Sequence, residues 1–85
     1  MKALVLEEYG RFNYKDVPDP SLRAPDDVIV RVKAAAICGS DVVGMDGSTG
    51  RRRPPIIMGH EASGEIVSCG GAVKAFAPGD RVTFD

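Results

Sequence analysis

Two side chains of this sequence, Cys38 and His60, have the chemistry of metal ligands. Cysteine sulfur and histidine nitrogen are natural donors for zinc, and a catalytic zinc site characteristically uses three protein ligands and leaves a fourth position open. His60 is the only histidine in the chain and lies 22 positions after Cys38. This spacing alone favours a simpler interpretation, because a buried cysteine is usually just a small apolar side chain.

The sequence around the two residues shifts the balance towards a metal site. Cys38 lies in Ile37-Cys38-Gly39-Ser40-Asp41, which closes a predicted strand, and His60 lies in Gly59-His60-Glu61-Ala62-Ser63-Gly64, which opens another. Both donors are thus expected at strand ends near loops. Functional residues are concentrated at such places.

The elements that must position these donors are predicted to be short strands separated by glycine and proline. The clearest strand is Asp27–Ala34, whose β-branched side chains alternate and place Val28, Val30 and Val32 on one face. A turn is expected at 9–12, and the remaining extended segments are 2–8, 14–17, 64–69 and 81–84. Such a pattern indicates an all-β barrel or sandwich.

One helical turn is expected directly after Cys38, over Ser40–Met45. Ser40 or Asp41 could cap its start, and Gly44 and Gly47 could end it.

Composition describes one small globular domain. The chain has 85 residues, 44% of them hydrophobic and 27% charged, with a net charge of −1. Arg51–Arg53 is the one concentration of positive charge; a solvated loop is the favoured interpretation and anion binding the alternative. We expect no nucleic-acid partner and no membrane partner, because three arginines are too few for the former and no apolar run is long enough for the latter.

The N-terminus carries no pattern of an export signal, so a cytoplasmic location is expected. Both cysteines are then expected to be reduced. Cys69 lies among apolar neighbours in a predicted strand and is interpreted as core, and Met58 as a packing residue.

A longer motif carries a family resemblance. The pattern Gly59-His60-Glu61-x-x-Gly64-x-x-x-x-x-Gly70-x-x-Val73, followed by Gly79-Asp80-Arg81-Val82, fits the zinc signature of the medium-chain dehydrogenase/reductase superfamily position by position. The chain resembles its zinc-containing alcohol and polyol dehydrogenases over its whole length, and is most similar to the polyol, sorbitol-dehydrogenase-like branch.

The resemblance implies roles for five residues. Cys38 would bind catalytic zinc as a thiolate and His60 through a ring nitrogen. Glu61 would exchange with water or substrate as a further ligand and take part in catalysis; its alternative is a surface carboxylate. Ser40 would be catalytic, bonding the substrate alcohol and passing its proton towards solvent. Asp41 would hydrogen-bond the histidine ligand. Helix capping is the alternative for Ser40 and Asp41.

One position departs from the pattern of many family members. Three residues after the relay serine, where these enzymes have a histidine as the outer member of the proton path, this chain has Val43. Valine carries no proton, so water must substitute or the path must leave elsewhere.

The resemblance also implies fold and cofactors. The fold would be a mainly β, partly open GroES-like barrel with one short helical turn after Cys38. Residues 1–85 would be an incomplete catalytic zinc domain, with the third zinc ligand beyond Asp85. The Rossmann domain that binds NAD or NADP is absent, since no Gly-x-Gly-x-x-Gly follows a strand. The parent enzyme would transfer hydride from a zinc-bound alcohol or polyol to nicotinamide.

We expect the isolated chain to be inactive, to bind zinc weakly and to be prone to self-association through exposed apolar surface. A non-catalytic GroES-like interaction module is the alternative function, since fold alone does not determine function. A zinc-free reductase of the same superfamily, such as a quinone reductase, ranks last because these proteins typically lack the two donors.

Overall fold

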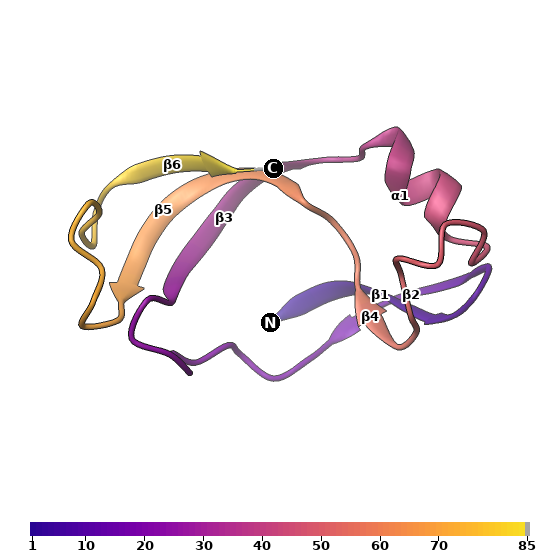
Figure 1. Cartoon of the computed structure of the whole chain (residues 1–85), viewed down its shortest axis with the longest axis horizontal. Helices are drawn as coiled ribbons and strands as arrows, with labels where there is room; N and C mark the ends of the chain where they lie inside the picture. Colours follow the sequence, from indigo (N-terminus) through magenta and orange to yellow (C-terminus); the bar gives the residue numbers. More distant parts are fainter. Residues whose placement is uncertain (85) are drawn as a thin grey trace. The chain divides into compact units, whose positions relative to one another are not determined.

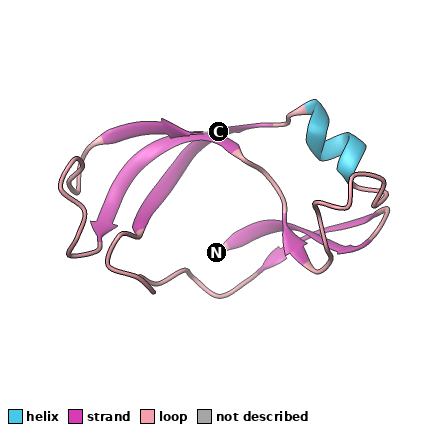
Figure 2. Cartoon of the chain, in the orientation of Figure 1, coloured by secondary structure: helices cyan, strands magenta, loops and turns pink. Residues whose placement is uncertain are grey.

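The computed structural model describes residues 1–84, which form six strands and one short helix (Figures 1 and 2). In chain order the elements are β1 (Lys2–Glu8), β2 (Arg11–Asp16), β3 (Val28–Ala36), α1 (Gly39–Gly44), β4 (Ile56–Ile57), β5 (Glu61–Cys69) and β6 (Arg81–Phe84). The chain divides into two compact units. The first contains residues 1–18 and 36–60, and the second contains residues 19–35 and those from 61 onward.

The predicted fold class, mainly β and partly open with one helical turn after Cys38, is confirmed. The strands form two three-stranded sheets, ordered β2-β1-β4 and β3-β5-β6. Neither sheet closes on itself among the described residues, and α1 is the one helix there (Figure 2). This helix is too short to cross a membrane, so the described residues contain no candidate membrane-spanning helix.

The first unit is built on the hairpin of β1 and β2. The strands pair antiparallel from Lys2 opposite Asp16 to Glu8 opposite Arg11, and only Tyr9 and Gly10 remain for the turn. The predicted turn over 9–12 was therefore too long, because cross-strand pairing recruits its second half into β2. The core of this unit lies on the central strand, where the buried residues are Ala3, Val5 and Leu6.

The second unit places β5 between β3 and β6 (Figure 1). Ile66, at the middle of β5, is 2% exposed and is the core residue of this sheet. β5 begins at Glu61, three residues before the predicted start, because pairing with β6 extends to Ala62 opposite Phe84. On β3 the predicted valine face is only partly covered, since Val32 remains 53% exposed.

A close backbone contact in the second unit requires a glycine at position 70. The Gly70 amide donates to the Asp27 carbonyl at 2.8 Å, and the Ala72 amide donates to the Pro25 carbonyl at 2.8 Å. A Cβ atom on Gly70 would lie 2.3 Å from the Pro25 oxygen, whereas one on Gly71 would meet nothing within 4 Å. The loop before β3 can therefore approach the end of β5 only if residue 70 has no side chain.

This contact predicts different effects for two neighbouring substitutions. Gly70→Ala should lower the free energy of unfolding by about 1–3 kcal/mol, because backbone must move to accept the methyl group. Gly71→Ala should leave it unchanged or slightly raised, since it meets no atoms and restricts the unfolded chain. Urea unfolding midpoints compare the two variants. Equal midpoints would show that the approach of Pro25 to Gly70 does not constrain the fold.

Candidate metal centre

The start of α1 is organised by Cys38 and Asp41. Cys38 is the N-cap residue, with extended backbone at φ −88° and ψ 147°. Its amide donates to Oδ2 of Asp41 at 3.2 Å, so a side chain in the first helical turn satisfies the amide of the cap. The expectation that Ser40 or Asp41 would itself be the cap was wrong. Cys38 is the last residue with extended geometry, and the helix begins at Gly39, which makes Cys38 the cap.

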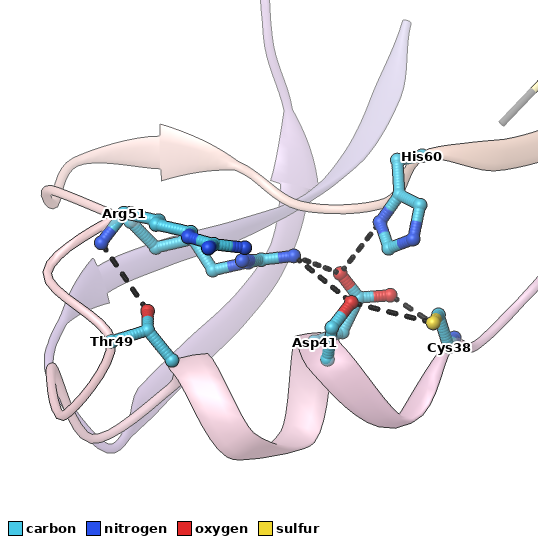
Figure 3. Close-up of polar contacts among 7 residues, drawn as sticks. Cys38, Asp41, Thr49, Arg51 and His60 are labelled. Atoms are coloured by element: carbon cyan, nitrogen blue, oxygen red, sulfur yellow. Dashed lines mark hydrogen bonds and ion pairs between the residues drawn. The ribbon is translucent and has the colours of Figure 1, made fainter.

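The Asp41 carboxylate joins three segments of the first unit. Its Oδ2 atom accepts from the Cys38 amide. Its Oδ1 atom lies 3.2 Å from Nδ1 of His60 and 3.3 Å from Nη2 of Arg52. Figure 3 shows the carboxylate lying between the His60 ring and Cys38. Asp41 is the one buried charged residue of the described chain, at 8% exposure.

The pKa of Asp41 lies below its ordinary value. Burial, the largest single influence, acts to raise this pKa by disfavouring the charged form. The Cys38 amide, the Arg52 guanidinium and the positive charge that His60 can carry act together in the opposite direction and outweigh it. Asp41 is therefore a carboxylate at neutral pH and can only accept hydrogen bonds.

The structure brings Cys38 and His60 together, as the sequence analysis expected. Their donor atoms lie within 4.8 Å of each other, and both residues are half-buried. The Ser40 hydroxyl donates to Sγ of Cys38 at 3.3 Å. A hydrogen bond with the Cys38 side chain, and secondarily the charge of Asp41, hold the pKa of His60 above its usual value, against the lowering effect of burial.

Glu61 follows His60 in the chain and is the first residue of β5. It is half-buried, and it belongs to the second unit. The Glu61 side chain therefore leaves the backbone one residue after the imidazole, at the first residue of the strand.

Gly59 determines how the chain arrives at His60. Its φ is +109°, in the region that disfavours every L side chain, while a Cβ atom there would meet nothing within 4 Å. The glycine is thus required by backbone conformation, and it sets the direction in which the histidine leaves the loop.

Arg52 is the member of this cluster that the sequence analysis missed. Arg51 and Arg53 are exposed, as expected of a solvated loop, but the Arg52 side chain is only 16% exposed. It donates to Oγ of Ser40 at 3.3 Å in addition to its ion pair with Asp41. The solvated-loop interpretation was therefore wrong for the central arginine. The sequence offers one signal for the burial of Arg52. The residue before a proline favours extended backbone, in which successive side chains point to opposite sides, so Arg52 is expected on the side opposite to Arg51 and Arg53.

The sequence analysis singled out three further residues, Cys69, Val43 and Met58. Cys69 was interpreted as a core residue of a strand. It is the last residue of β5 and is only half-buried, and its Sγ lies 3.9 Å from the Phe76 carbonyl. Neither Cys38 nor Cys69 forms a disulfide, as expected of reduced cysteines. Val43 is 59% exposed, and Met58 is half-buried.

Comparison with known proteins is decisive for the family. Residues 24–85 match the model of the alcohol dehydrogenase GroES-like domain. The chain belongs to this family. Cys38, His60, the Asp41 carboxylate and β5 all lie in the matched region.

Curated relatives and solved structures agree with this assignment. The chain is 42% identical over 86 residues to a protein named probable D-xylulose reductase A of Emericella nidulans, covering 98% of this chain and 24% of that protein. It is 42% identical over 82 residues to a probable zinc-binding alcohol dehydrogenase of Mycobacterium tuberculosis, covering 96% of this chain and 21% of that protein.

Among solved structures, alcohol dehydrogenase TADH from Thermus sp. ATN1 superposes with a TM-score of 0.84 at 37% identity, covering 98% of this chain and 24% of that one. The GroES-like domain of dehydrogenases is thus both the sequence family and the fold of this chain. The chain spans about a quarter of the length of the relatives it matches.

The lowered pKa of Asp41 predicts how stability depends on pH. An acid whose pKa falls on folding adds stability above its unfolded pKa, about 3.9, and this is lost as pH falls through the lower folded value. At pH 7, Asp41→Asn should lower the free energy of unfolding by about 1.5–3 kcal/mol, the worth of one hydrogen bond to a charged group. The gap between the two proteins should close progressively as pH falls from about 4 through the lower folded pKa of Asp41, because the side chain becomes protonated over this range and then resembles asparagine.

Denaturant unfolding of both proteins at a series of pH values measures this gap. A gap of constant size down to pH 2 would contradict the assignment of Asp41 as an ionised acceptor.

Proposed function

We propose that these 85 residues are the zinc-binding part of the catalytic domain of an NAD(P)-dependent alcohol or polyol dehydrogenase. Cys38 and His60 would be zinc ligands, and Glu61 an exchangeable one. The observation that carries the proposal is the convergence of a thiol and an imidazole within 4.8 Å, on segments 22 residues apart in a domain of the dehydrogenase family.

The donor set fits zinc in chemistry and orientation. Sulfur and imidazole nitrogen are preferred zinc donors. Nδ1 of His60 faces the Asp41 carboxylate, which holds the proton on that nitrogen and leaves Nε2 with a lone pair for the metal. Glu61, one residue further along the chain, can supply an oxygen donor in place of water or substrate. This leaves one protein ligand to come from elsewhere in the parent enzyme.

Cys38 and His60 would hold a zinc ion, which would supply Lewis-acid chemistry that favours loss of a proton from an alcohol. Ser40 is suited to receive that proton, because its hydroxyl is next to the Cys38 sulfur and can accept and donate at once. Ser40 is also exposed to solvent. Passing the proton on to water would require the Ser40 hydroxyl to rotate away from Cys38 Sγ, which its exposed position allows. Water would then take the place of the histidine that Val43 replaces.

The activity of the whole protein would require the remaining three-quarters of the relatives' length. A Gly-x-Gly-x-x-Gly motif for the dinucleotide does not occur in these residues. The relatives named D-xylulose reductase support a polyol or its keto form as the substrate class. The substrate would be a small molecule bound at the metal.

Metal binding by the chain tests the proposal. Titration with Co²⁺ should give a thiolate-to-cobalt charge-transfer band with one metal per chain, and Zn²⁺ should displace the cobalt. Affinity should be modest, because the ligand shell is incomplete. Cys38→Ser should abolish the band and His60→Gln should weaken binding at least tenfold. Cys69→Ser is the matched control and should bind like the unmodified chain.

A band that survives Cys38→Ser, or one that Cys69→Ser also removes, would place the metal elsewhere and sink the proposal. A chain that binds no metal would favour the interaction module instead.

A second expectation concerns turnover. The chain by itself should not reduce NAD or NADP in the presence of alcohols or polyols, because it carries no dinucleotide site. Absorbance of the reduced cofactor measures this. Turnover that Cys38→Ser abolishes would show that the 85 residues hold more of the catalytic machinery than the proposal assigns.

A further inference from the structure

We propose that Arg52 is a positioning residue for the metal centre, which it serves by fixing the Asp41 carboxylate and the Ser40 hydroxyl. The inference rests on the proposed function, in which Cys38 and His60 bind zinc. It adds a residue that lies in the loop after α1 and does not itself offer a metal ligand.

The Arg52 guanidinium contacts two side chains of the first turn of α1. Its Nη2 atom lies 3.3 Å from Oγ of Ser40 and 3.3 Å from Oδ1 of Asp41. The Arg52 and Asp41 side chains are 16% and 11% exposed, so the pair is largely shielded from water. An ion pair in such surroundings is less screened than one on the surface, and removing one partner leaves a buried charge uncompensated.

Charge balance makes Arg52 necessary when the metal is bound. Among the described residues, Asp41 is paired with Arg52 and with His60. A histidine that binds a metal is neutral, so it then gives Asp41 a hydrogen bond but no formal positive charge. The Arg52 guanidinium remains as the cation beside this carboxylate.

Arg52 also determines which way the Ser40 hydroxyl points. The guanidinium can only donate, so Oγ of Ser40 must accept from it. The single hydrogen of the hydroxyl is then left to donate, and its acceptor is Sγ of Cys38 at 3.3 Å. Arg52 thereby turns the hydroxyl towards the proposed metal ligand, and loss of Arg52 would free it to rotate.

Gly44 provides the space that this arrangement needs. Gly44 is buried at the end of α1, and a Cβ atom there would lie 2.5 Å from Cδ and 3.2 Å from Nε of Arg52. The arginine therefore lies directly against the helix. Arg51 and Arg53, its neighbours in the chain, are exposed and serve as matched controls.

Cobalt affinity and the charge-transfer spectrum of the full 85-residue chain test the proposal. Arg52→Gln should weaken Co²⁺ binding about tenfold or more, the usual effect of losing a residue that orients a metal ligand. Arg51→Gln and Arg53→Gln should stay within about twofold of the unmodified chain. Arg52→Lys should recover only part of the loss, because an ammonium keeps the charge but lacks the planar fork.

Two further variants separate positioning from folding. Gly44→Ala keeps Arg52 and favours the helix, yet its methyl group must displace the arginine, so it should weaken cobalt binding in the same direction as Arg52→Gln. In an Asp41→Asn background, Arg52→Gln should cost clearly less affinity than alone, because the two residues act through one contact. Circular dichroism of the metal-free variants checks that they fold.

The outcomes are distinguishable. Absence of any metal binding by the unmodified chain would overturn the proposed function and this inference with it. Binding that Cys38→Ser abolishes but Arg52→Gln leaves equal to Arg51→Gln would overturn the inference alone. An undiminished effect of Arg52→Gln in the Asp41→Asn background would do the same.

Discussion

The Asp41 carboxylate is the constraint on which this part of the structure depends. A buried carboxylate is tolerated only when its oxygens are paired, and here the backbone of Cys38, the ring of His60 and the guanidinium of Arg52 pair them. These partners come from the start of α1, the residue before β5 and the loop after α1. Satisfying one side chain thus fixes three segments, and the two donor residues are held close in the process.

The sequence predicted the strands well where local pattern alone decides them. β1 and β6 have the predicted bounds, and β3 contains nearly all of its predicted segment. The errors include Arg11–Phe12, which was expected in a turn, Glu61–Ser63, which precedes the predicted start of its strand, and the unpredicted β4. Pairing with a neighbouring strand decides their conformation, and that neighbour is distant in sequence for β5. Such information is not present in a local window.

Within the candidate metal centre, the family motif was a better guide than local chemistry. Cys38, His60 and Asp41 were expected from the resemblance, and the structure brings their side chains together within one unit. Local rules placed the helix cap wrongly and treated Arg52 as a solvated charge. Both errors have the same origin. The Asp41 carboxylate accepts from the Cys38 amide and also pairs with Arg52, eleven residues later, and no rule of local sequence spacing predicts that second contact.

Gly59 is restricted by its backbone conformation and not by lack of space for a side chain. With φ at +109° and empty space where a side chain would begin, an L residue would be strained by about 1–3 kcal/mol although it would touch nothing. A D-alanine introduced by chemical synthesis prefers positive φ and would adopt this conformation without strain. The backbone conformation just before His60 is therefore determined by stereochemistry. A D residue at position 59 could raise the stability of the fold, whereas an L residue there would lower it.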